Sequence, residues 1–211
     1  MKIILASKSP RRREILENLG IKFTIITEVT DESSNVTEPS KLVRELAERK
    51  GAAVADKSIN MIKTEGAFGG EDTLVLSSDT VVAANGAILG KPRDLDDARD
   101  MLRRIEGREH SVFSGIAAAL ISGGEVVKTA SAVEETVVRF SPMTEADIEF
   151  YVNNESVLDK AGAYAIQGIA SAWIDGIDGD YFNVVGLPVR RLMTMLGEEF
   201  GLTLELLRSD I

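Results

Sequence analysis

Residues 111–140, SVFSGIAAALISGGEVVKTASAVEETVVRF, decide the fold of this chain. Ser111–Ser122 and Glu125–Phe140 have the β-branched and small apolar residues of long strands. Gly123-Gly124 lies between them and suits a tight reversal of the chain. The sequence therefore predicts a long antiparallel ribbon near the centre of the molecule.

Around this ribbon, apolar spacing and turn residues predict alternating helices and strands. Asn85-Gly86 suits a tight hairpin, and Pro10 suits the first turn of a helix that Ser7 or Ser9 would cap. Strands are expected at 2–6, 23–26, 74–76 and near 172–174, a hairpin at 81–89, helices from 10 to 19, from Ser40 past Val54, from Asp94 to Arg104, at 144–151 and at 187–196, and a loop at 57–73.

This order of elements predicts an α/β fold that contains a mixed sheet with a long antiparallel ribbon. Helix-rich ends on either side of the ribbon indicate two lobes around a cleft. Because no stretch of the sequence reads as a linker, we expect one domain spanning residues 1–211.

The composition narrows the range of functions. The formal net charge of -10 disfavours binding to nucleic acid or to an anionic membrane. The chain has no cysteine, so it can form neither disulfides nor thiolate metal sites. No run approaches the roughly 20 apolar residues of a membrane span, and we expect a soluble, cytoplasmic protein.

A basic cluster stands out against this acidic background, at the point where the first strand would lead into a helix. Backbone N–H groups at a helix N-terminus, serine hydroxyls and guanidinium groups all suit phosphate oxygens. A solvated helical turn is the alternative, and the segment lacks the glycine-rich P-loop pattern. The residues concerned are Ser7, Lys8, Ser9, Arg11, Arg12 and Arg13.

Asp79 in Ser78-Asp79-Thr80 is the second candidate, because it follows the expected strand at 74–76. The carboxyl edge of a strand is where open α/β sheets bind ligands, although a simple turn aspartate is the alternative. Lys91 lies just beyond the hairpin, so both side chains could face one cleft. That pair would combine a base or metal ligand with a phosphate-binding cation.

Carboxylates are the available metal ligands. His110 is the only histidine of the chain and a lone histidine is more often structural, so a zinc site is disfavoured. Asp31, Glu32 and Asp79 could instead hold a hard cation such as Mg²⁺ or Mn²⁺.

A third candidate is the small-residue segment Lys160–Gly168, KAGAYAIQG. Small residues let a ligand approach the backbone, and the Gln167 amide could match the base edge of uracil or thymine. A surface turn with a solvent-facing amide is the alternative.

Together these segments resemble the Maf family of nucleotide pyrophosphatases, which shares its fold with the inosine-triphosphate pyrophosphatases. The resemblance covers nearly the whole chain, and five motifs in the right order are highly specific. They are LASKSPRR at 5–12, SDT at 78–80, GKPR at 90–93, DKAGAYAIQG at 159–168 and VVGLP at 184–188.

The resemblance implies a role for each matching residue. Asp79 would be the catalytic aspartate that activates water, and Glu32 would accompany it at a divalent metal cation, Mg²⁺ or Mn²⁺. Arg11, Arg12, Lys50 and Lys91 would hold the triphosphate, and Arg11, Thr80 and Gln167 would tune the choice of base.

The form of residues 163–168 is similar to the branch of the family that prefers dTTP and UTP. The implied activity is hydrolysis of these nucleotides, or of modified pyrimidine nucleotides, to the monophosphate and pyrophosphate, which cleans the nucleotide pool. The expected partner is a small-molecule nucleoside triphosphate rather than nucleic acid or membrane, and a homodimer is allowed. The alternatives are a non-hydrolytic nucleotide-binding regulator linked to cell-division arrest and a phosphatase that releases orthophosphate.

Overall fold

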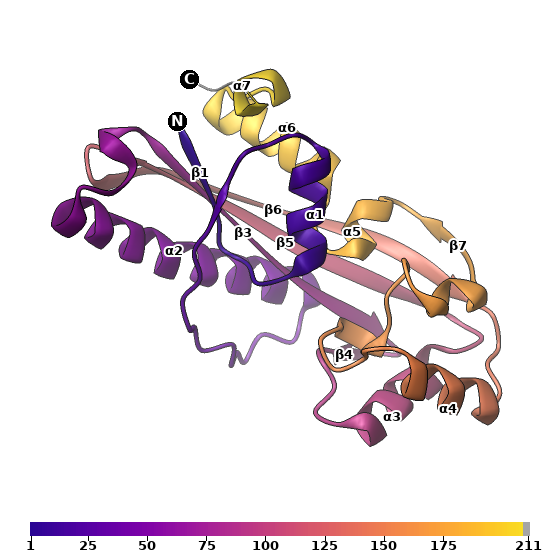
Figure 1. Cartoon of the computed structure of the whole chain (residues 1–211). Helices are drawn as coiled ribbons and strands as arrows, with labels where there is room; N and C mark the ends of the chain where they lie inside the picture. The colour runs from indigo at the N-terminus through magenta and orange to yellow at the C-terminus, as the bar shows by residue number, and fades with distance from the viewer. Residues whose placement is uncertain (209–211) are drawn as a thin grey trace.

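The computed structural model describes residues 1–208, in which seven strands form one mixed sheet with helices on both faces (Figure 1). The strand order is β2-β1-β3-β5-β6-β7, and β4 pairs with β3 outside this path. β1 is parallel to β2 and β3, whereas the other pairs are antiparallel, so the predicted mixed α/β fold is confirmed. The strands are β1 Lys2–Leu5, β2 Thr24–Ile25, β3 Thr73–Ala84, β4 Ala87–Leu89, β5 Glu109–Ser122, β6 Glu125–Phe140 and β7 Ile174–Asp178.

The long ribbon is present as predicted and is the spine of the sheet. β5 and β6 pair from Glu109 opposite Arg139 to Ser122 opposite Glu125. The reversal uses Gly123 at φ 60° and Gly124 at φ 80°, a backbone region that side chains with a Cβ rarely adopt. β3 adds a third long strand along the other edge of β5, so three long strands form the centre of the sheet.

Helices cover both faces of this sheet. Strand residues of alternating parity enter two different apolar clusters: Leu74 and Leu76 pack with α1 and α6, whereas Val75 packs with α2. Alternate residues of a strand point to opposite faces, so α2 lies on one face and α1 and α6 on the other. The helices are α1 Pro10–Asn18, α2 Pro39–Glu65, α3 Leu95–Ile105, α4 Glu145–Asn154, α5 Tyr181–Val185, α6 Val189–Phe200 and α7 Leu204–Arg208, with 3₁₀ turns at Ala67–Gly70, Ala161–Ala163 and Ile169–Trp173.

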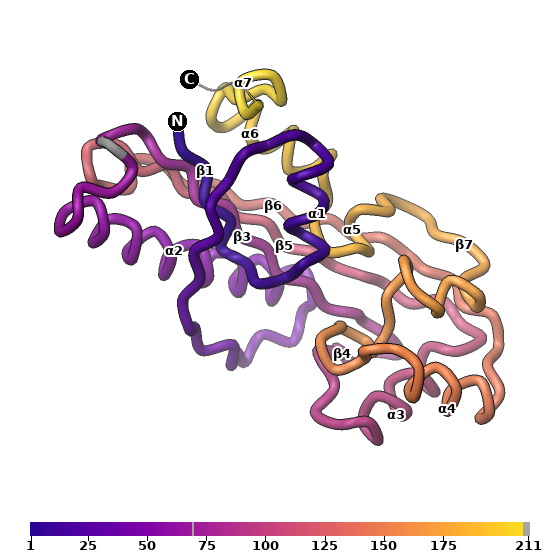
Figure 2. The backbone as a smooth tube through the Cα atoms, in the orientation of Figure 1, coloured from indigo at the N-terminus to yellow at the C-terminus, as the bar shows by residue number. Residues whose placement is uncertain are grey.

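A third apolar cluster makes the second lobe. It joins α3 and α4 to β4 and to the later part of β3, and Tyr151 and Leu102 are among its fully buried side chains. Figure 2 shows this group of segments set apart from the end that carries α1, α2, α6 and both termini, while β3, β5 and β6 pass through both parts. The predicted two lobes are therefore present, on one continuous sheet.

Two sequence predictions were wrong in extent. The loop expected at 57–73 is helical as far as Glu65, because its polar residues lie on the exposed side of α2 and Ser58 is satisfied by the carbonyl of Val54 at 2.7 Å. α2 ends at Gly66, whose φ of 63° is left-handed. The strand expected near 172–174 begins only at Ile174, since a 3₁₀ turn occupies Ile169–Trp173. Within residues 1–208, no helix is long and apolar enough to cross a membrane.

Candidate active site

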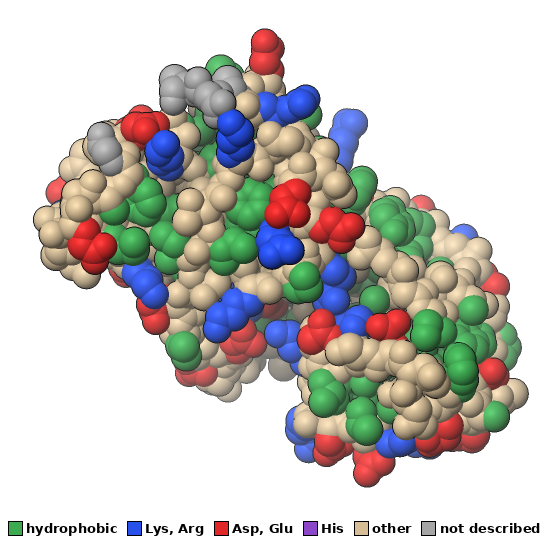
Figure 3. Space-filling model, in the orientation of Figure 1, with side chains coloured by type: hydrophobic (Ala, Val, Ile, Leu, Met, Phe, Trp, Pro, Cys, Tyr) green, Lys and Arg blue, Asp and Glu red, His purple; other side chains and the backbone are tan. Residues whose placement is uncertain are grey.

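A cleft of about 460 Å³ lies between the two lobes, at the point where β1 leaves the sheet. Leu5, the last residue of β1, is opposite Leu76, and the chain then turns into α1 while β3 continues to Ala84. The prediction that Asp79 lies at the carboxyl edge of its strand was wrong. Asp79 is in the middle of β3, because β5 continues the ladder with Gly115 opposite it, and the strand that ends beside the site is β1. Figure 3 shows the hollow, with Lys, Arg, Asp and Glu side chains gathered around it.

The structure brings ten of the predicted site residues to this cleft, although they come from six separate stretches of the sequence. Two residues of the sequence analysis lie elsewhere: the Asp31 carboxylate accepts bonds from Ser33, and Arg13 pairs with Glu17 on the surface of α1. Of the two adjacent acidic residues, Glu32 is therefore the one in the cleft. The predicted residues that line it are Ser7, Ser9, Arg11, Arg12, Glu32, Lys50, Asp79, Thr80, Lys91 and Gln167.

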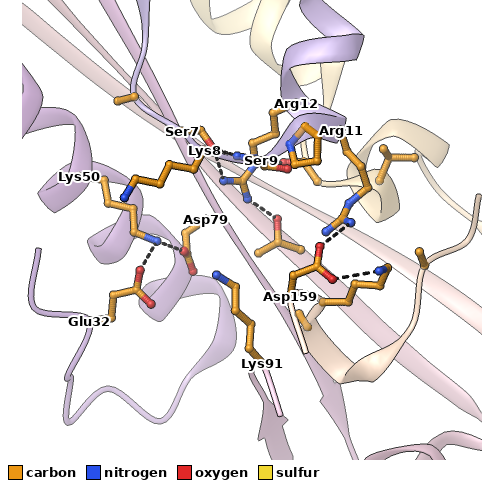
Figure 4. A pocket seen from close by; sticks show the side chains of 18 of the residues that line it. Ser7, Lys8, Ser9, Arg11, Arg12, Glu32, Lys50, Asp79, Lys91 and Asp159 are labelled. Carbon is orange, nitrogen blue, oxygen red and sulfur yellow. Dashed lines mark hydrogen bonds and ion pairs between the residues drawn. The ribbon is translucent and has the colours of Figure 1, made fainter. Parts of the chain in front are cut away.

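Lys50 joins the two carboxylates of the site. Its Nζ lies 2.5 Å from Asp79 Oδ1 and 2.8 Å from Glu32 Oε1. Figure 4 shows the Lys50 ammonium between these two carboxylates. The hydrogen bond from Lys50 holds the pKa of the Glu32 carboxyl below its usual value. Among the described residues, none hydrogen-bonds the second oxygen of Asp79, Oδ2, so this oxygen is available to a ligand.

The close packing of α2 against the sheet explains why Lys50 reaches Asp79. A Cβ on Gly115, opposite Asp79, would lie only 2.1 Å from the carbonyl oxygen of Val43 in α2. A Cβ on Gly51 would likewise lie 2.8 Å from Ser77 Oγ, which donates to the carbonyl of Ala47 at 2.7 Å. Glycine at 51 and 115 thus lets the helix approach the strands that carry the site.

Arg12 ties the start of α1 to β3 and to the loop before α6. Its guanidinium donates to the carbonyls of Gly186 at 2.8 Å and Ser78 at 2.7 Å, to Ser7 Oγ at 3.2 Å and to Thr80 Oγ1 at 3.0 Å. Burial lowers the pKa of Arg12, and the negative charge of Asp79 opposes that shift. Arg12 therefore has most of its donors engaged by the protein itself.

The N-terminus of α1 faces the cleft without a side-chain cap. The prediction that a serine side chain caps this helix was wrong: Ser9 takes the N-cap position but its hydroxyl makes no capping bond. Ser7 Oγ instead accepts from the Ser9 N–H at 3.2 Å and from Arg12. The first N–H groups of α1 are consequently left for an anion.

The opposite side of the cleft is formed by the loop after α4. Asp159 pairs with Arg11 at 3.3 Å and with Lys160 at 2.9 Å (Figure 4). Gln167 is exposed at the rim and has no partner among residues 1–208. Tyr164, in the same segment, also lines the cleft. Its hydroxyl lies 2.7 Å from His110 Nε2, so the lone histidine has a structural bond.

Sequence reasoning assigned no role to Asp159 or Lys160. Asp159 meets Arg11 across 148 positions of sequence, and only the fold brings them together.

The positive charge of the cleft also arises only when the chain is folded. Its described lining has six Lys or Arg against four Asp or Glu, in a chain whose net charge is -10.

The carboxylates also fit a divalent cation shared with a ligand. Mg²⁺ is usually held by one or two carboxylates together with substrate phosphates. Glu32 and Asp79 provide two carboxylates close together, because both pair with the ammonium group of Lys50. Among the described residues no group of three or more His, Cys, Asp or Glu could hold a metal, so a complete cage made by the protein is absent there.

The fold and site define a mixed α/β protein with an electropositive, carboxylate-containing cleft for a polyanionic ligand. A family profile described as Maf-like protein matches residues 2–199, and the chain belongs to this family.

Curated relatives match over almost the full length of both chains. A dTTP/UTP pyrophosphatase of Caldanaerobacter subterraneus subsp. tengcongensis is 45% identical over 95% of this chain and 90% of its own. One of Clostridioides difficile is 44% identical over 97% and 98%, respectively. Among solved structures, the Ham1 protein of Staphylococcus aureus aligns over 66% of this chain and 72% of its own, with 11% identity and a TM-score of 0.38, which is too weak a likeness to carry an argument.

Proposed function

We propose that this protein hydrolyses nucleoside triphosphates, with dTTP and UTP preferred, to the monophosphate and pyrophosphate. The observation that carries the proposal is the free Asp79 oxygen set among cations in one cleft. The names of the relatives, all 42–45% identical, support the reaction and the two substrates.

Asp79 is the general base in this reaction. Lys50 fixes one oxygen of its carboxylate, which leaves Oδ2 to accept the proton of a water molecule that attacks the α-phosphorus. The bond from the α-phosphorus to the bridging oxygen breaks, and pyrophosphate departs with the electron pair.

The cations of the cleft neutralise the triphosphate and the departing pyrophosphate. Lys8 and Lys91 are exposed at the cleft and make no ion pair with any described residue, so they are available to phosphate oxygens. Arg11 is held lightly by Asp159 and the N–H groups of α1 point at the same region. Arg12 contributes charge while holding the surrounding backbone in place.

A divalent cation, Mg²⁺ or Mn²⁺, would be held by Glu32 and Asp79 together with the phosphates. Such an ion supplies charge neutralisation at the phosphates and lowers the pKa of a bound water. The protein's own part is to keep the two carboxylates side by side through Lys50.

The test is a panel of canonical and modified nucleoside triphosphates with Mg²⁺ or Mn²⁺, assayed separately for pyrophosphate and orthophosphate. Pyrophosphate released fastest from dTTP and UTP supports the proposal. Orthophosphate as the product would indicate a phosphatase, and tight binding without any product would indicate a nucleotide-binding regulator.

A further inference from the structure

We propose that Ser114 is a positioning residue for the choice of base, acting through the hydroxyl of Thr80. Ser114 is fully buried in β5 and is not part of the cleft lining, whereas Thr80 is. This inference rests on the proposed function, with the base placed against the cleft-lining Thr80, and adds to it the reason why the ring N–H of uracil or thymine would be selected.

Three hydrogen bonds in series connect the cleft, through β3 and β5, to the backbone of α5. Arg12 Nη2 lies 3.0 Å from Thr80 Oγ1, which lies 2.8 Å from Ser114 Oγ. Ser114 Oγ in turn lies 3.1 Å from the backbone carbonyl oxygen of Asn183 in α5. The ends of this series have fixed roles, because a guanidinium only donates and a carbonyl only accepts.

The fixed ends decide where both hydroxyl protons point. Ser114 has one proton, and the carbonyl of Asn183 takes it. Ser114 must then accept from Thr80, which uses the single proton of Thr80. Thr80 already accepts from Arg12, so its hydroxyl retains one lone pair and no proton for a ligand in the cleft.

An oxygen that only accepts distinguishes the pyrimidine bases. Uracil and thymine have an imide N–H, whereas cytosine has a lone pair on the same ring nitrogen. A Thr80 oxygen in this state would bond the imide and would oppose the lone pair of cytosine, which adds a repulsive element to the selection. Gln167 cannot make this distinction alone, because its exposed amide can turn either its oxygen or its nitrogen to the base.

The test is Ser114→Ala, which frees the proton of Thr80 to point into the cleft. We expect the ratio of kcat/KM for UTP to that for CTP to fall on the order of tenfold, the usual scale of one hydrogen bond, with kcat for UTP little changed. The matched control is Ser111→Ala on the same strand, whose hydroxyl bonds the exposed Glu135 and which should keep the wild-type ratio.

Repeating the Ser114→Ala change in a Thr80→Val variant tests whether Ser114 acts through Thr80 or only through the stability of the fold. In Thr80→Val the acceptor is gone, so adding Ser114→Ala should no longer change the UTP to CTP ratio. An unchanged ratio in folded Ser114→Ala, or the same change in both backgrounds, would overturn the inference. If Ser114→Ala does not fold, Thr80→Val alone decides, because an unchanged ratio there contradicts the role of the Thr80 oxygen. Failure of the wild-type protein to release pyrophosphate from any nucleotide would instead remove the proposed function.

Discussion

The two walls of the cleft differ in how firmly their side chains are held. The first wall, formed by α1, α2 and β3, has Asp79, Lys50 and Arg12 bonded to one another or to the backbone. The second wall, residues 159–167, has its polar groups nearer the solvent: the exposed Asp159 pairs with Arg11 and Lys160, and the exposed Gln167 amide has no partner among residues 1–208. Every nucleoside triphosphate has the same phosphates but a different base, so a fixed wall suits the shared chemistry and an adjustable wall suits selection.

The largest difference between the walls should come from neutralising one carboxylate on each. Asp79→Asn keeps the shape of the side chain but removes the base, so kcat for pyrophosphate release should fall by about a hundredfold or more. Asp159→Asn, the matched change on the second wall, should alter kcat only a few-fold. It weakens the ion pairs of a half-exposed carboxylate with Arg11 and Lys160, and Lys160 keeps Glu155 as a charged partner. Equal losses in the two variants would show that the walls do not divide the work in this way.

His110, which bonds Tyr164 of the second wall, should make the stability of the fold depend on pH. Burial lowers the pKa of His110 to about 4, whereas the unfolded chain takes up this proton near its usual pKa of 6.5. The unfolded state therefore binds more protons in this window, and stability falls as the pH drops from about 6.5 to 4, by up to about 3 kcal/mol. Urea unfolding at several pH values measures this slope, and it should flatten in His110→Phe. A slope that persists in the variant would assign the effect to other groups.

The first wall depends on how closely α2 approaches the sheet. Gly115→Ala places a Cβ against the backbone of Val43, and we expect the free energy of unfolding to drop by about 1–3 kcal/mol. Activity should fall as well, since α2 carries Lys50. Gly197→Ala in α6 is the control, because its Cβ would meet nothing closer than 3.8 Å, and it should leave activity unchanged. Thermal unfolding and pyrophosphate release, measured on both variants, check the pair.

The smallest effect should appear at the rim of the second wall. Gln167→Ala should change the preference among UTP, dTTP and CTP by a few-fold, with kcat on the best substrate nearly unchanged, because one exposed hydrogen bond is lost. Steady-state kinetics on the three nucleotides provide the comparison. A uniform loss on all of them would place Gln167 at the phosphates instead.

Local signals in the sequence predicted local features correctly. Asn85-Gly86 forms its hairpin with φ of 52° and 75°, and Thr144 opens α4 in a capping box with Asp147. The hairpin also predicted that Asp79 and Lys91 could face one cleft, and both line it.

Features that depend on residues far apart in the sequence could not be predicted from the sequence. Nothing near Asp159 in the sequence indicates Arg11, and nothing near residue 57 shows that α2 has a sheet to pack against. The length of β3 beyond Leu76 depends on its pairing with β5, which runs from Ser77 opposite Ala117 to Ala83 opposite Ser111. The proton order through Ser114 depends on four groups, in Arg12, Thr80, Ser114 and Asn183, that only the fold brings together.

The unbroken ribbon beneath the cleft limits how the molecule can move. β3, β5 and β6 belong to both lobes, so rotating one lobe against the other would require shearing a ladder that includes eleven paired positions between β3 and β5. Hinge closure over microseconds to milliseconds is therefore disfavoured, and nucleotide entry is left to side-chain and loop motions in the picosecond to microsecond range. The nucleotide then enters by diffusion into a cleft of constant width. The cations of the cleft attract it, and added salt should lower the association rate because it screens this attraction.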